Sequence, residues 1–109
     1  MKWRRPPSGY PSWVNVTDKT CVSAAAHVAI KPLEKRAVVV DLNTGQCWEL
    51  NEVAFAIWQL LTTGASVGKT AEEISARYGV AQDVSQLDVL TLVRSLADQR
   101  LVVIQANGP

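Results

Sequence analysis

The middle of the chain alternates apolar and polar side chains in a way that predicts a β-hairpin. Val38, Val40 and Leu42 recur with the two-residue period of a half-buried strand. A three-residue loop over residues 43–45 then reverses the chain, because its glycine can adopt the left-handed conformation that such loops need. A short second strand over residues 46–50 completes the hairpin.

The second strand of this hairpin leads directly into a helix. Trp48 and Leu50 lie on one face of the strand, and Cys47 and Glu49 lie on the other. Asn51 follows and can cap a helix, because its side-chain oxygen accepts a backbone N–H that has no partner within the helix.

One further strand and the first helix flank the hairpin. A strand over residues 27–31 would turn Val28 and Ile30 inward and end at Pro32, which has no N–H for a strand ladder. The helix over residues 52–62 repeats apolar side chains at i, i+3, i+4 and i+7, the spacing of one buried face. Three antiparallel strands therefore precede the first helix.

Two more helices follow. Thr70 and Glu73 have the spacing of a capping box, which predicts that the second helix begins at Thr70. Gly79 marks its expected end. The third helix is predicted to open at Asp83 and to run to about Arg100, and the apolar residues that follow it should pack back on the body. The order β-β-β-α-α-α describes a small α+β, winged-helix-like fold.

The third helix carries more apolar surface than one core contact requires. Its apolar side chains fill an arc of about 220°, whereas a single buried stripe is only slightly wider than about 100°. One set should face the core and consists of Val89, Leu92, Val93 and Leu96. A second set beside it could line a groove and consists of Leu87, Leu90, Arg94 and Ala97. Alternatively, the extra leucines meet the first helix and the C-terminal apolar segment inside the core.

The short strand over residues 46–50 also allows two interpretations. At the edge of a sheet, its backbone could receive an extended peptide as an additional strand. Alternatively, it is an ordinary core hairpin of a small α+β domain.

Composition narrows the function. The chain has 109 residues, a formal net charge of +1, two cysteines without metal-ligand spacing and a single histidine. We expect no catalytic set, no metal and no cofactor, and therefore no enzyme. No signal peptide and no run of about 18 apolar residues occurs, so we expect a cytoplasmic protein without a membrane partner.

A winged-helix DNA-binding protein is the main alternative function. A recognition helix should expose Arg, Lys, Asn or Gln, but here Arg94 and Arg100 are interspersed with Asp88 and Asp98. The low net charge argues against nucleic acid in the same way.

The order and spacing of these segments resemble the PqqD-like family, whose members are also called RiPP recognition elements. The resemblance covers residues from about 27 to 104. It rests on Val-Val-Val-Asp-Leu-Asn-Thr-Gly-Gln-Cys-Trp-Glu-Leu-Asn at residues 38–51, Gly64, Thr-Ala-Glu-Glu-Ile at residues 70–74, and Tyr-Gly-Val at residues 78–80. Within the family, the chain looks most like the stand-alone lasso-peptide leader-binding proteins.

The resemblance implies a non-catalytic protein that binds the leader of a ribosomally synthesised precursor peptide. Its further partners would be a leader peptidase and a cyclase or other modifying enzyme of the same pathway. The leader would pair with the third strand and lie against the third helix. The implied peptide-binding residues are Gln46, Cys47, Trp48, Glu49 and Leu50 on the strand, and Leu87, Leu90, Arg94 and Ala97 on the helix.

The N-terminal residues differ in composition from the rest. We expect residues 1–24 to be a flexible or loosely docked extension, and residues 25–105 to be the peptide-recognition domain. The extension contains Trp3, Tyr10 and Trp13, which are costly to expose, so one hypothesis is that residues near 10–16 contact the body and compete with the leader. The alternative is a mobile terminus.

Overall fold

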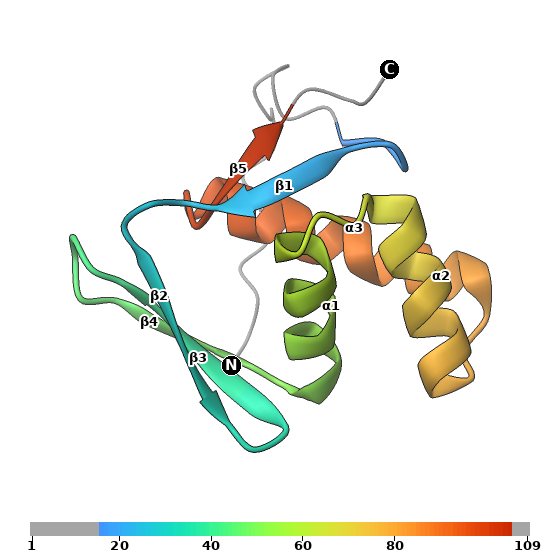
Figure 1. The fold of residues 1–109 in the computed structure, drawn as a ribbon, viewed down its shortest axis with the longest axis horizontal. Helices are drawn as coiled ribbons and strands as arrows, with labels where there is room; N and C mark the ends of the chain where they lie inside the picture. The colour runs from blue at the N-terminus through green and yellow to red at the C-terminus, as the bar shows by residue number, and fades with distance from the viewer. Residues whose placement is uncertain (1–15, 106–109) are drawn as a thin grey trace.

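A computed structural model describes residues 16–105 of the chain. The elements follow in the order β1 (Cys21–Ala24), β2 (Val28–Leu33), β3 (Arg36–Asp41), β4 (Cys47–Leu50), α1 (Glu52–Thr62), α2 (Val67–Tyr78), α3 (Gln82–Asp98) and β5 (Val102–Gln105). β2, β3 and β4 form an antiparallel sheet with β3 in the centre, and β1 pairs with β5 in a second antiparallel sheet. In Figure 1 the three-stranded sheet lies on one side of α1, and α2 lies on the other. The predicted α+β fold with three helices after the hairpin is confirmed.

The second sheet joins the two ends of the described chain and was not predicted. Its register places Val22 opposite Ile104, and Ala25 N–H donates to Leu101 C=O at 3.0 Å just beyond the strands. Val22 and Val16 are buried, so the described part of the predicted extension packs on the body. Residues 1–15 lie outside the described residues, so the division of the chain at residue 24 stays a prediction. Strands so far apart in sequence leave no local pattern that indicates their pairing.

The core-facing side of α3 is as predicted. Its four members are at most 4% exposed: Val89, Leu92, Val93 and Leu96. They pack in one cluster with the apolar face of α1, which includes Ile57, Trp58 and Leu61. The helical period alone was sufficient to identify this face, because a buried stripe must repeat every three or four residues.

Helix α1 begins and ends as predicted, whereas α2 begins one turn early. Asn51 Oδ1 accepts from Ala54 N–H at 2.8 Å and caps α1. In α2 the cap is Ser66, so the predicted capping box at Thr70 is wrong. The first-turn donors of α2 find partners elsewhere: Val67 N–H donates to the C=O of Thr20, at 2.9 Å. This tertiary contact adds to the local Ser66 cap, whose side chain accepts from Lys69 N–H at 3.2 Å, in fixing the helix start. The ends of α2 at Gly79 and of α3 lie close to their predicted positions.

The β3–β4 turn is closed by Asp41. Its backbone N–H donates to Gln46 C=O at 2.9 Å, and its C=O accepts from Gly45 N–H at 2.7 Å. Its side chain accepts from Asn43 N–H at 2.8 Å. The connection between β3 and β4 therefore spans residues 42–46 rather than the predicted three residues, and the Asp41 side chain supports this longer turn. Gly45 adopts the expected left-handed conformation, with φ of 77°.

Alternate residues of β3 are buried, but they are not the residues that indicated the strand. Ala37 and Val39 are completely buried, whereas Val38 is half-buried and Leu42 is 64% exposed. The two-residue period is correct, and the inner face is the other half of the pattern.

Strand β2 continues through Pro32 to Leu33, beyond its predicted end. Leu42 N–H donates to His27 C=O, which sets the alternation of backbone groups along β2. Pro32 consequently turns its nitrogen toward the outer edge of the sheet, where no bond to β3 is lost.

Candidate functional site

β4 is an edge strand. In the described part of the chain it pairs with β3 and with no other strand. The turn bond between Asp41 and Gln46, together with the register of Val39 opposite Trp48, directs the backbone groups of Trp48 toward β3. Cys47 is one position away and therefore directs its backbone N–H and C=O to the opposite side. An edge of this kind can accept another strand.

Two cavities lie along the same side of α3, one against the start of α1 and the other against the start of β4. One, of about 370 Å³, is lined by Asn51, Val53, Ala54, Ile57, Asp88, Thr91 and Leu92. The other, of about 240 Å³, is lined by Gln46, Cys47, Trp48 and Gln99. The second cavity joins the start of β4 to the end of α3, and the first lies beyond the end of β4 against the middle of α3. We call the two cavities and the β4 edge together the β4–α3 groove.

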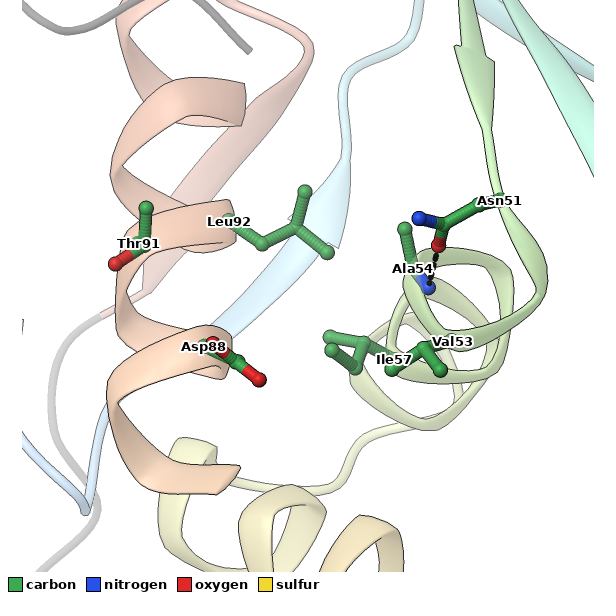
Figure 2. A pocket seen from close by; sticks show the side chains of 7 residues that line it. All are labelled: Asn51, Val53, Ala54, Ile57, Asp88, Thr91 and Leu92. Carbon is green, nitrogen blue, oxygen red and sulfur yellow. Dashed lines mark hydrogen bonds between the residues drawn. The ribbon is translucent and has the colours of Figure 1, made fainter. Parts of the chain in front are cut away.

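The first cavity has apolar walls and one carboxylate. Figure 2 shows Leu92 and Asp88 reaching from α3 toward α1, where Ile57 and Val53 face them. The side-chain oxygen of Asn51 is occupied by its bond to the α1 backbone. The cavity can therefore receive a largely apolar side chain, with polar contact available at one end.

The predicted strand residues divide between the groove, the core and the opposite face. Gln46, Cys47 and Trp48 line the groove. Leu50 is completely buried, so its side chain is part of the core beneath it. Glu49 lies on the opposite face of β4, where its Oε2 is 3.2 Å from Arg36 Nη1.

The predicted helix residues do not line either cavity of the groove. Leu87 is 63% exposed, Arg94 is exposed, Leu90 is half-buried against the core, and Ala97 is 3% exposed. Ala97 contributes instead to a separate cavity of about 600 Å³ beside β5. At 3.6 residues per turn, this set lies roughly 130° around α3 from the groove residues. A peptide-binding role for it stays a prediction.

The α3 residues that do line the groove were missed, except for Leu92, which was assigned to the core. They are Asp88, Thr91, Leu92 and Gln99. The three polar members share one side of α3, and polarity made that side look like solvent-exposed surface. The apolar arc singled out the opposite flank of the core face, and only the three-dimensional structure tells which flank lies toward β4.

The described residues contain neither a metal-binding cluster nor a membrane-spanning helix. Within residues 16–105 no group of three or more His, Cys, Asp or Glu side chains is arranged to hold a metal ion. Over the same residues no helix is both long and apolar enough to cross a membrane.

Comparison with known proteins places this geometry in a family. The model of coenzyme PQQ synthesis protein D (PqqD) matches residues 36–102. The PqqA binding protein of Bradyrhizobium diazoefficiens is 26% identical over 89 residues, which make up 82% of this chain and 86% of that protein.

Two solved structures have the same fold. TbiB1 in complex with the TbiA(beta) leader peptide has a TM-score of 0.72 and 26% identity, over 78% of this chain and 99% of that one. Lasso peptide synthetase B1 complexed with the leader peptide has a TM-score of 0.71 and 24% identity, over 75% and 96%. The family match extends from β3 to the start of β5 and so includes every element of the β4–α3 groove. The chain is a member of the PqqD family.

Proposed function

We propose that this protein binds the leader segment of a ribosomally synthesised precursor peptide, of the lasso type, by strand addition to β4. The carrying observation is that the edge strand β4 lines one cavity of the β4–α3 groove and leads directly into Asn51, which lines the other. The proposal is supported by the two structural neighbours, whose complexes contain leader peptides, and by the relative named for binding PqqA.

In strand addition, backbone hydrogen bonds and side-chain contacts contribute differently to binding. Main-chain hydrogen bonds at Cys47 would hold an extended peptide without regard to its sequence. Successive side chains of that peptide point to opposite faces, so every second one would enter the groove between β4 and α3. Affinity would therefore come largely from the edge, and specificity from the two cavities.

The bound leader would then be presented to a leader peptidase and to a cyclase or other modifying enzyme. The protein's own role would be non-catalytic. The groove offers apolar walls, amide side chains, one carboxylate, the Thr91 hydroxyl and the Cys47 thiol. His27, which could serve as a base for a thiol, lies outside the groove beside Asp41. A nucleophile and a base must lie within hydrogen-bond reach of each other to act together.

DNA binding, the alternative suggested by a winged-helix fold, is disfavoured by charge. α3 would be the recognition helix, and it contains one arginine and three aspartates. A helix with an excess of negative charge is repelled by the phosphates that dominate such interfaces.

Fluorescence anisotropy tests the proposal. The probe is a labelled synthetic peptide that corresponds to the leader of the precursor encoded in the same biosynthetic cluster. We expect saturable binding, competition by the unlabelled leader, and none by a scrambled leader of the same composition. A labelled duplex oligonucleotide at the same salt concentration is the control for DNA binding. Binding of the duplex without binding of the leader would overturn the proposal.

A further inference from the structure

Asp88 places a negative charge in the larger cavity of the β4–α3 groove. Its carboxylate extends from α3 toward the first turns of α1 (Figure 2). Four side chains around the same cavity are aliphatic: Val53, Ala54, Ile57 and Leu92. The cavity therefore combines an apolar wall with a single charged group.

The described residues provide no cation for this carboxylate. The positions three and four residues away on α3 are occupied by valine, serine, threonine and leucine, and none of the residues that line the cavity is basic. Other acidic side chains do have cations nearby: Glu49 lies 3.2 Å from Arg36, and Glu72 lies 3.8 Å from Lys69. Within residues 16–105 Asp88 forms no ion pair and is solvated at the rim of an apolar cavity.

This arrangement favours one kind of ligand side chain. Lysine and arginine lay their aliphatic stems along apolar surface while the charged head remains at a polar group. A carboxylate strengthens the hydrogen bond to such a head, and a peptide that covers the cavity would lower the local dielectric constant and strengthen the attraction further. An acidic side chain in the same place would be repelled.

We propose that this cavity is a subsite for a lysine or arginine side chain of the leader peptide, whose charged head pairs with Asp88. The inference rests on the proposed function, since it concerns the same groove. It adds the chemical class of one leader residue and assigns its recognition to Asp88, with the stem of that residue against Val53, Ile57 and Leu92.

The test couples one charge on the protein to one on the peptide. Each lysine of the labelled leader is replaced in turn by norleucine, and each arginine by citrulline, which removes the charge but keeps the length. Binding is measured to the wild type, to Asp88→Asn and to Glu73→Gln. Glu73 is the matched control, because it is an exposed carboxylate on α2, outside the groove, and its substitution changes the net charge equally.

We expect one neutralised leader residue to weaken binding to the wild type about 5- to 30-fold and to leave binding to Asp88→Asn unchanged. Glu73→Gln should behave as the wild type. Asp88→Lys should regain affinity for a leader in which the identified basic residue is replaced by glutamate. Thermal unfolding of each variant checks that the fold is retained.

The outcomes separate the two proposals. A wild-type protein that binds no leader overturns both. A leader that binds the wild type but shows no basic residue coupled to Asp88, or contains none, overturns the subsite alone. A coupled serine, threonine or tyrosine would also overturn it, since the carboxylate would then recognise a hydroxyl group.

Discussion

Replacing Cys47 by proline tests whether a backbone N–H of β4 holds the leader. The Cys47 N–H points away from β3, so proline removes the donor at the outer edge and leaves the β3–β4 bonds intact. One hydrogen bond contributes about 0.5–1.5 kcal/mol net, and the proline ring also obstructs the incoming strand. We expect a total loss of about 1–3 kcal/mol, which raises Kd about 5- to 150-fold at tenfold per about 1.4 kcal/mol.

Cys47→Ala is the matched control, because it removes the thiol and keeps the N–H. The assay is leader anisotropy, with amide hydrogen exchange of residues 46–50 in the wild type before and after leader is added. Leader should slow the exchange at Cys47 in particular. Thermal unfolding should show both variants folded, since proline is tolerated on edge strands. Equal Kd values for Cys47→Pro and Cys47→Ala would refute strand addition at this edge.

Three further predictions follow from burial, backbone conformation and the N-terminal residues. In urea titrations, Leu96→Ala should lower the free energy of unfolding by about 2–5 kcal/mol, because Leu96 is completely buried. Leu87→Ser, at a 63% exposed position, should change it by less than about 0.5 kcal/mol. Equal losses would contradict the separation of the two α3 faces. Arg100→Gly should raise the free energy of unfolding by about 0.5–1 kcal/mol and increase Tm. Arg100 follows the end of α3 with a φ of 61°, which glycine adopts without strain. A lower Tm would contradict this prediction. Deleting residues 1–15 should lower the Kd for leader if the extension competes for the groove. An unchanged Kd would show that the extension does not compete. The deletion stops short of Val16 and Thr20, which are buried.

Local signals predicted much of the fold because they act within a few residues. The helix start at Asn51 depends on one side-chain bond to Ala54 N–H, and the buried face of α3 depends on a spacing of three and four residues. At the start of α2 the local Ser66 cap is joined by a bond from Val67 N–H to the C=O of Thr20, and β1 depends on β5 at the other end of the chain. The two long-range contacts leave no nearby trace in the sequence.

Of the candidate site, the β4 side could be predicted from the sequence and the α3 side could not, because the α3 side depends on contacts between distant residues. Residues 46–50 follow a hairpin pattern, and the edge position of β4 was foreseen as one of two interpretations. The α3 side of the groove depends on which flank of the helix meets β4, and this is set by the packing of the whole core. Asp88 and Thr91 lie on that flank, whereas Leu87 and Arg94 do not.

The position of Pro32 has a consequence for stoichiometry. Of the two edges of the three-stranded sheet, the β2 edge carries a proline nitrogen that faces outward, so an approaching strand would find one donor missing there. The β4 edge has no proline. Strand addition to the three-stranded sheet is therefore directed to one side, and this sheet should capture a single extended peptide. The β2 edge is poorly suited to join a second copy of the protein into a longer sheet.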